Sequence, residues 1–209
     1  MENEYLDIFS EQGQHIGKKT RLEAHQKGLW HQTFHCWIVS NIDGKWHVLL
    51  QKRHSSKDTN PNLYDVSAAG HLLAGEGPED GVRELEEELG LTVEYDSLLF
   101  VKVFRQEISY SKLIDREMCH VYFYECNQPL QNYQIQIEEV SGLVRLELEQ
   151  GIQLFSGELQ EVECSGFEID EEGNTIQVAC PISKTDFVPH SNQYYRDTFE
   201  AIRQYSLRG

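Results

Sequence analysis

The chain has 209 residues, of which 39% are hydrophobic, and this is enough to bury one core and favours one domain over two. Its 18 basic and 35 acidic side chains give a net charge of −17, so repulsion argues against nucleic acid and anionic membranes as partners. The five cysteines are odd in number and lack C-x-x-C spacing, which argues against a disulfide framework or a zinc site. No apolar run approaches 18 residues, and we expect a soluble cytoplasmic protein.

The first 126 residues predict mainly β-strands. Residues 4–18 have the pattern of a short hairpin, and residues 21–30 indicate a connection with one helical turn. The runs FHCWIVS and WHVLLQ are separated by NIDG, which is a turn signal between two strands. The strands that we expect after the hairpin cover residues 34–40, 46–51, 63–69, 98–106 and 118–126.

The pattern weakens after Pro129. Residues 135–140 indicate a strand, residues 143–154 mix helical and extended signals, and residues 159–178 indicate a hairpin with its turn at 170–174. Tyr195, Phe199 and Ile202 recur near helical spacing and predict a closing helix, with Asn192 as its N-cap. We therefore predict a single domain over residues 1–209, with a core of about residues 30–140, an acidic insertion or extension at 140–190, and the closing helix at 192–207.

The stretch from Gly70 to Leu91 is the centre of the chain. It predicts an amphipathic helix with Pro78 in its first turn and Gly90 just past its end. Val82, Leu85 and Leu89 recur at helical spacing and form the expected buried stripe.

Glu84, Glu87 and Glu88 lie at i, i+3 and i+4 and share another face of this helix. Like charges at this spacing destabilise a helix by about 0.2–0.5 kcal/mol per pair. A hard cation such as Mg²⁺ turns this repulsion into coordination, because it prefers oxygen ligands. The alternative from charge alone is a solvated acidic face, which is common in acidic proteins.

The order of residues favours the metal. Arg83 to Leu91 reads RELEEELGL and matches R-E-U-x-E-E-x-G-U, where U is aliphatic, and Gly70 and Glu76 supply the preceding G-x5-E. These residues resemble the Nudix box, so the chain resembles a Nudix hydrolase. It departs from the pattern in one place, because six residues instead of seven separate Glu76 from Arg83.

The resemblance implies an α/β fold, namely an α/β/α sandwich with a mixed β-sheet. It also implies Mg²⁺-dependent hydrolysis, with Mn²⁺ as the alternative ion, of a diphosphate linkage in a nucleoside diphosphate derivative or similar small molecule. The metal ligands would be Glu84, Glu87, Glu88 and the Gly70 carbonyl, and Arg83 would orient the carboxylates. Glu87 or Glu117 would take the proton of the attacking water; alternatives for a distal acid are Glu125, Glu138 and Glu139.

A local basic loop stands out in this acidic protein. Arg53 and Lys57 are four residues apart and follow a predicted strand. They suit capture of a diphosphate by charge-assisted hydrogen bonds, and an ordinary solvated loop is an equal alternative.

The segment from 4 to 126 also resembles the Nudix branch that includes isopentenyl-diphosphate isomerase, on the strength of YLDIFSEQGQHIG, LLQKRHSSKD and SAAGH. In that isomerase the residues matching Arg53 and Lys57 contact the substrate diphosphate, and we place His71 beside the substrate as well. The isomerase has a cysteine acid where this chain has Ala69, so proton transfer at carbon lacks its acid here.

The isomerase binds a metal through histidines and two acids. The candidates here are His25, His31, His71, Asp115 and Glu117. Ordinary packing is the alternative for each histidine, and we prefer it for His25 and His47. Three other functions stay open: an isomerase, a diphosphate-binding module without catalysis, and protein interaction through residues 140–190. A homodimer is also open.

Overall fold

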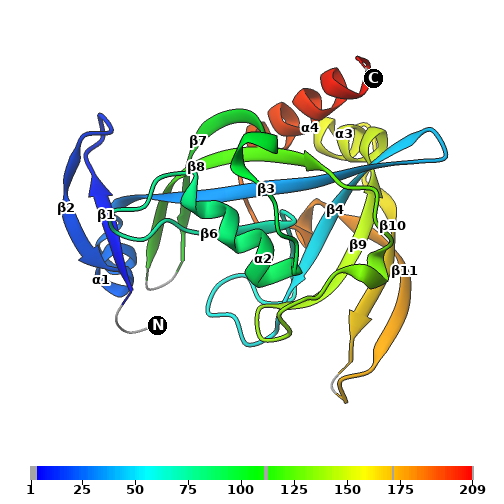
Figure 1. The fold of residues 1–209 in the computed structure, drawn as a ribbon, viewed down its shortest axis with the longest axis horizontal. Coiled ribbons are helices and arrows are strands. Elements are labelled where there is room, and N and C mark those ends of the chain that lie inside the picture. The colour runs from blue at the N-terminus through cyan, green and yellow to red at the C-terminus, as the bar shows by residue number, and fades with distance from the viewer. Residues whose placement is uncertain (1–3, 111–112, 171, 209) are drawn as a thin grey trace.

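The computed structural model describes residues 4–110, 113–170 and 172–208. The elements in chain order are β1 (Tyr5–Phe9), β2 (His15–Thr20), α1 (Arg21–Lys27), β3 (Trp30–Ile42), β4 (Lys45–Arg53), β5 (Tyr64–Asp65), β6 (Ala68–His71), α2 (Arg83–Leu89), β7 (Leu99–Ser109), β8 (Ile114–Glu125), β9 (Val140–Glu147), α3 (Leu148–Ser156), β10 (Glu161–Ile169), β11 (Thr175–Ser183) and α4 (Asn192–Ser206). The strands form one hydrogen-bonded sheet in which β3 and β8 are parallel and the other pairs are antiparallel. Helix α2 packs on one side and α3 and α4 pack on the other (Figure 1), which confirms the expected sandwich with a mixed sheet.

Strand β3 organises the sheet because it pairs with four other strands, β1, β4, β6 and β8. Residues 30–39 run parallel to β8, and this register places His31 beside Glu117. On its other edge, residues 33–36 pair with β6, so that Thr33 faces His71 and Phe34 faces Gly70. Strand β3 therefore brings the Nudix-box glycine and the acids of β8 to the same region.

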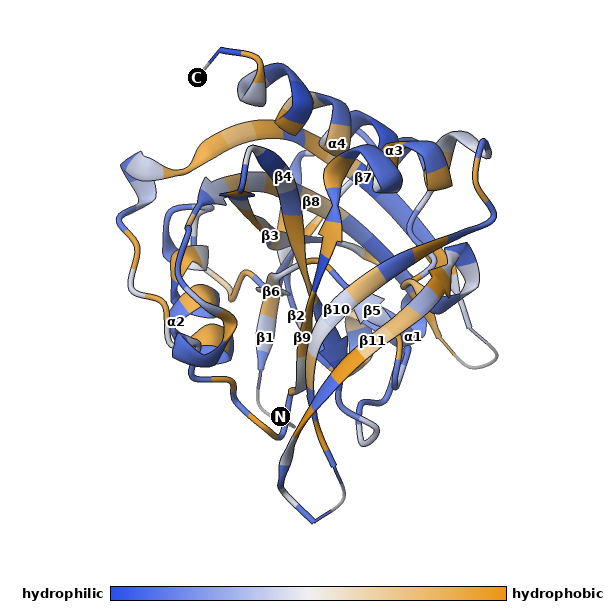
Figure 2. Ribbon diagram, turned by 90° about the vertical axis from the view of Figure 1, so that its right-hand side faces the viewer, coloured by the Kyte–Doolittle hydropathy of each residue, from blue (hydrophilic) through white to orange (hydrophobic). Residues whose placement is uncertain are grey.

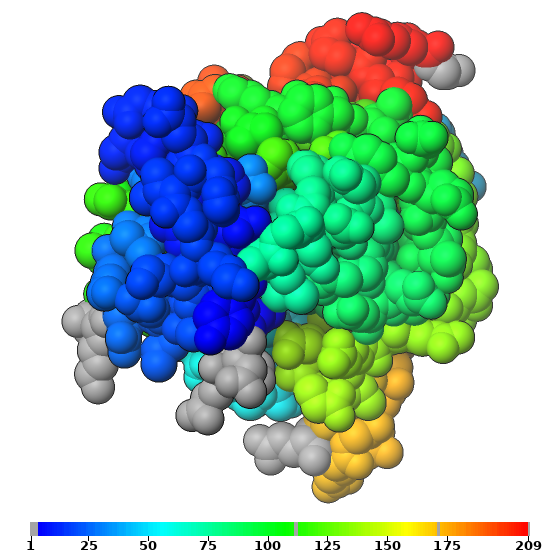
Figure 3. Space-filling model, turned by 60° about the vertical axis from the view of Figure 1, so that its left-hand side comes forward, coloured from blue at the N-terminus to red at the C-terminus, as the bar shows by residue number. Residues whose placement is uncertain are grey.

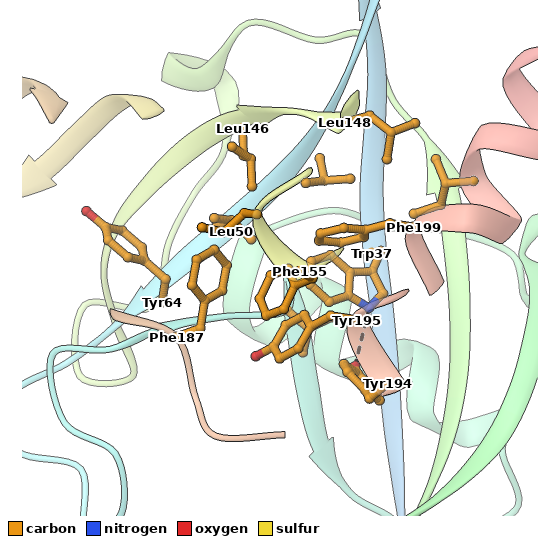
Figure 4. Packing of buried hydrophobic residues seen from close by; sticks show 14 of the residues in the cluster. Trp37, Leu50, Tyr64, Leu146, Leu148, Phe155, Phe187, Tyr194, Tyr195 and Phe199 are labelled. Carbon is orange, nitrogen blue, oxygen red and sulfur yellow. Dashed lines mark hydrogen bonds between the residues drawn. The ribbon is translucent and has the colours of Figure 1, made fainter. Parts of the chain in front are cut away.

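Two buried clusters hold the helices to the sheet. Leu85 and Leu89 of α2 are fully buried against Phe34 and Tyr122, and each such leucine contributes about 1.5–3 kcal/mol. On the opposite face, Trp37 is packed among aromatic residues of α3 and α4 (Figure 4). Strands β3, β4 and β8 are hydrophobic over much of their length (Figure 2), as two-sided burial requires.

The Nudix-box helix begins later than the sequence predicts. Asp80–Val82 form a 3-10 turn, and α2 starts at Arg83 instead of near Pro78. Gly81 lies directly on Phe34, where an added Cβ would come within 2.5 Å of its side chain. This close contact fixes a tight turn at the place where the box is one residue short. The C-terminal end agrees with the prediction, since Gly90 has a left-handed conformation.

Other element predictions were wrong in detail. Residues 137–139 form a turn, and the strand begins only at Val140. The N-cap of α4 is Ser191, whose hydroxyl accepts from the Tyr194 amide at 3.2 Å, and Asn192 is the first helical residue. Helix α1 has seven residues instead of one turn. The hairpins at 4–18 and 159–178 are confirmed as β1–β2 and β10–β11, although Glu171 of the predicted turn lies outside the described residues.

Residues 140–183 extend the same sheet. Strand β9 pairs with β4, β10 pairs with β9, and α3 packs against α4. At the opposite end, β1 lies against the segment after β6, where Leu6 bridges to Leu73 and the Ala74 amide donates to the Tyr5 carbonyl at 2.8 Å (Figure 3). The division of the chain into a core and an extension remains a prediction.

The cysteines behave as core thiols. All five are free, and Cys36, Cys119 and Cys164 are buried. None of the helices in the described ranges combines the length and the apolar character needed to span a membrane.

Candidate functional site

Arg83 connects the acids of α2 to the end of β6. Its Nη1 donates to Glu84 at 2.5 Å and to Glu87 at 3.3 Å, and its Nη2 donates to the His71 carbonyl at 2.8 Å. A planar guanidinium with several fixed donors suits this bridging role. Arg83 therefore orients two of the three acids and holds the backbone at His71.

Glu76 keeps its contact with this arrangement although the Nudix box is one residue short. Its carboxylate accepts from the Leu73 amide at 2.7 Å and from the Arg83 guanidinium at 3.3–3.4 Å. The shortening is absorbed by the tight turn that leads into α2. The relation between Glu76 and Arg83 is preserved.

Glu84 and Glu88 are buried at the interface between α2 and β6. Burial raises the pKa of Glu84 to about 7 and that of Glu88 to about 8, and their mutual repulsion raises the pKa of Glu88 further. Glu88 accepts hydrogen bonds from Gln51 Nε2 and the Ala69 amide, both at 3.1 Å. A Cβ on Gly70 would overlap the Glu84 carboxylate, so only glycine leaves room for this acid.

Glu87 differs from its two neighbours because its side chain is 54% exposed. Its side chain points to solvent, and its Oε2 accepts a hydrogen bond from Arg83. The box thus presents one open carboxylate above two buried ones. The predicted acidic face exists, and Glu86 is exposed outside it.

Three histidines from different elements meet on the other side of β6. His25 comes from α1, His31 from β3 and His71 from β6, and their ring centres are 5.1–5.3 Å apart. Their nitrogens lie within 4.8 Å of one another. We expected His25 to serve packing alone, but helix α1 turns its ring towards the other two, which makes it a further candidate ligand.

Asp115 completes this group, which we call the histidine centre (His25, His31, His71, Asp115 and Glu117). The Asp115 Oδ1 is 3.5 Å from His25 Nε2 and 3.4 Å from His31 Nε2. Glu117 Oε1 is 4.0 Å from His71 Nε2. Two ligands held about 2.1 Å from one metal ion at a tetrahedral angle are about 3.4 Å apart, so the two distances from Asp115 to the histidines fit coordination.

The hydrogen bonding of the histidine centre also fits a metal ion. The Nε2 atoms of all three histidines and the Oδ1 of Asp115 are buried and lack hydrogen-bond partners among the residues that the structure describes. The Nδ1 of His31 donates to the Leu29 carbonyl at 2.9 Å, which leaves the lone pair on Nε2. Burial lowers the pKa of each histidine, so the rings are neutral, which is the form that binds metals.

Glu117 lies between the histidine centre and the core. Its Oε2 is 4.0 Å from His35 Nε2 and accepts from the Cys119 thiol at 3.5 Å. Burial and the nearby Asp115 raise its pKa well above the usual range. This burial favours the protonated form of the Glu117 carboxyl.

The two basic residues of the predicted substrate loop are both engaged by acids. Arg53 Nη1 donates to Asp65 at 2.9 Å, and Lys57 pairs with Glu139. The Lys57 charge lowers the pKa of Glu88, which places Lys57 near the box acids. Asp65, which partners Arg53, was missed in the sequence because a lone aspartate after a strand carries no pattern.

The chain is similar to known proteins in both sequence and fold. A model of the NUDIX domain matches residues 29–161. A Nudix hydrolase of Clostridium acetobutylicum is 43% identical over 202 residues, which cover 97% of this chain and 98% of that protein. The isopentenyl-diphosphate Delta-isomerase of Aliivibrio fischeri is 38% identical over 90 residues, covering 43% of this chain and 50% of the isomerase.

Among solved structures, a Deinococcus radiodurans protein superposes with a TM-score of 0.54 at 21% identity, over 74% of this chain and 90% of that one, and this likeness supports the fold. The family model covers well over half of the chain, and the Clostridium relative covers nearly all of it. The chain belongs to the Nudix family and is a hydrolase of the Nudix type.

Proposed function

We propose that this chain hydrolyses a diphosphate linkage in a small molecule, a nucleoside diphosphate derivative or a similar compound, with Mg²⁺ as its cofactor. The observation that supports this most is the α2 face, where Glu84 and Glu88 are buried one turn apart beneath the open Glu87. Two buried carboxylates with raised pKa values are costly unless a cation compensates them.

Glu84, Glu87 and Glu88 would hold the Mg²⁺, with the Gly70 carbonyl as a further ligand. When bound, Mg²⁺ supplies Lewis-acid stabilisation of phosphoryl oxygens and lowers the pKa of water. Arg83 keeps Glu84 and Glu87 in place through its paired donors. Glu87 faces solvent and is the carboxylate best placed to take a proton from the attacking water; Glu117 is the alternative.

The diphosphate would meet Arg53 and Lys57. Arg53 uses three of its five N–H groups in bonds to the Thr59 carbonyl and Asp65, which leaves one on each terminal nitrogen for a phosphate. Lys57 would exchange Glu139 for the substrate. His71 would lie beside the substrate, at the junction of the two acidic groups.

The histidine centre would hold a second divalent ion. Three neutral imidazoles with carboxylates suit a transition metal such as Mn²⁺ better than Mg²⁺. The same centre favours a second candidate function, isomerisation of an allylic diphosphate, because it resembles the metal site of the isomerase. Ala69 argues against that candidate, since no ionisable side chain stands where the isomerase has its acid thiol. The homodimer and the cytoplasmic location remain predictions.

The test is phosphate or nucleotide release from a panel of diphosphate metabolites, with and without Mg²⁺. The panel includes nucleoside diphosphates, dinucleotides, sugar nucleotides, coenzyme A and isoprenoid diphosphates, and double-bond migration is followed in the last class. Glu88→Gln should abolish Mg²⁺-dependent release, whereas Glu86→Gln, on the exposed side of the same helix, should retain it. Full turnover in the Glu88→Gln variant would contradict the proposal, and double-bond migration without hydrolysis would favour the isomerase.

A further inference from the structure

The segment between β11 and α4 reaches the loop that carries Arg53. The Val188 amide donates to the Tyr64 carbonyl at 2.9 Å, and Phe187 forms a parallel bridge to Tyr64. Phe187 packs with Tyr64, Phe155 and Tyr195 (Figure 4), and the Tyr195 hydroxyl donates to the Val188 carbonyl at 2.6 Å. These contacts fix the backbone that leads into His190.

His190 is held against Asp65 in the interior. Its Nε2 is 3.6 Å from Asp65 Oδ1, and both side chains are only 5% exposed. A carboxylate can only accept, so the Nε2–H of His190 faces the oxygen. The ring lies close to the rings of Tyr194 and His35, with centre distances of 4.5 and 5.4 Å, which restricts its rotation.

Asp65 passes this restraint on to Arg53. Its Oδ2 accepts from Arg53 Nη1 at 2.9 Å, and its Oδ1 also accepts from the Val66 amide at 2.8 Å. The Thr59 carbonyl takes the opposite side of the guanidinium. The Arg53 guanidinium is thus fixed on two sides. Its charge is near enough to Glu117 to lower the pKa of that carboxyl.

We propose that His190 and Asp65 are positioning residues that hold the Arg53 guanidinium in the orientation for binding a diphosphate. The inference rests on the proposed function, in which Arg53 contacts the substrate. It assigns a role in the site to the C-terminal segment, which lies outside residues 29–161 that match the family model. A fixed guanidinium loses less conformational entropy on binding than a free one, which favours affinity.

The experiment measures binding of inorganic pyrophosphate by calorimetry, in Mg²⁺, to the full chain. The variants are Arg53→Gln, Asp65→Asn, His190→Ala, His190→Gln and His190→Asn. The amide nitrogen of glutamine reaches the position of histidine Nε2, whereas that of asparagine reaches only as far as Nδ1. His47→Gln, a half-buried histidine at the far end of β4, is the matched control.

We expect Asp65→Asn, His190→Ala and His190→Asn to raise the Kd for pyrophosphate about tenfold, the loss expected from one weakened charge-assisted contact. His190→Gln should stay within about threefold of the parent, because its amide nitrogen can take the place of Nε2 facing Asp65. A purely structural role predicts equal effects of glutamine and asparagine. If His190→Ala does not fold, the comparison of His190→Gln with His190→Asn still tests the proposal.

Three results would overturn the proposal, and they can be told apart. If Arg53→Gln weakens pyrophosphate binding but the Asp65 and His190 variants do not, positioning is refuted and the Arg53 contact of the proposed function stands. If Arg53→Gln has no effect either, that contact is refuted and positioning falls with it. Equal losses in His190→Gln and His190→Asn would also refute positioning.

Discussion

Ionisation of Glu88 should make the metal-free protein less stable as the pH rises. Glu88 is 6% exposed, and burial raises its pKa to about 8, from 4.5 for an ordinary glutamate. The folded chain therefore holds this proton more tightly than the unfolded chain does. The resulting stability is fully present below pH 4.5 and is lost as the pH rises from there through 8. The two pKa values differ by 3.5, and at about 1.36 kcal/mol per pKa unit the upper limit of the loss is about 5 kcal/mol.

Glu88→Gln removes this loss because the amide stays neutral at every pH. Its oxygen can still accept from Gln51 and the Ala69 amide, so the hydrogen bonds of Glu88 are kept. Water that enters on ionisation reduces the real cost. We therefore expect the free energy of unfolding of the variant at pH 8 to be about 1–3 kcal/mol higher than that of the parent. Near pH 5 the difference should disappear, since Glu88 is then protonated.

The assay is urea denaturation in the presence of EDTA at pH 5, 6.5 and 8. Glu86→Gln is the control, because this neighbouring carboxylate is exposed and its substitution should change stability equally at all three pH values. Adding Mg²⁺ at pH 8 should stabilise the parent and leave Glu88→Gln unchanged. A Glu88→Gln variant that is no more stable than the parent at pH 8 would refute the reasoning that the buried carboxylate is destabilising without a cation.

Three further predictions concern the box acids of α2 and the histidine centre, which lie on either side of β6. Gly70→Ala should lower the free energy of unfolding by about 1–3 kcal/mol and abolish Mg²⁺-dependent turnover, because its methyl group displaces Glu84; unchanged denaturation and turnover would contradict this. Arg83→Lys should lower kcat by about 10–100-fold in steady-state assays, since an ammonium cannot hold two acids and the His71 carbonyl together, and a normal kcat would show that this bracing is dispensable. His71→Ala should weaken Mn²⁺ binding by about 100-fold, measured by calorimetry, while His47→Ala should not; equal affinities would rule out the histidine centre as the Mn²⁺ site.

The local patterns of the Nudix box could be predicted because each depends on residues close in sequence. Helical spacing alone places Leu85 and Leu89 in the core and the box acids on another face, and the structure agrees. The start of the helix could not be predicted in this way. It depends on the contact between Gly81 and Phe34, which belongs to a strand more than forty residues earlier, and sequence periodicity carries no information about such a contact.

The histidine centre shows the same limit more clearly. Resemblance named its candidates, but sequence spacing gave no reason to include His25, because the distance in space between two histidines depends on the conformation of the residues that join them. In the structure, α1 and the start of β3 turn both rings towards His71. Asp65 and His190 are separated by 125 positions and have no motif, so only the bridge between Tyr64 and Phe187 reveals that they meet.

The box acids and the histidine centre both contact the backbone at Gly70 and His71, which connects the two groups of candidate ligands. Gly70 lies against Glu84, and the next residue, His71, gives its ring to the histidine centre and its carbonyl to Arg83. The Arg83 guanidinium therefore connects the box acid Glu84 to the backbone of His71. The chain combines a box that keeps all three of its acids, although it is one residue short, with a histidine centre that lacks the isomerase acid at Ala69. Proton transfer at carbon lacks the acid thiol of the isomerase in that arrangement, while hydrolysis of a diphosphate with Mg²⁺ can use the carboxylates that the box retains, and this asymmetry favours hydrolysis.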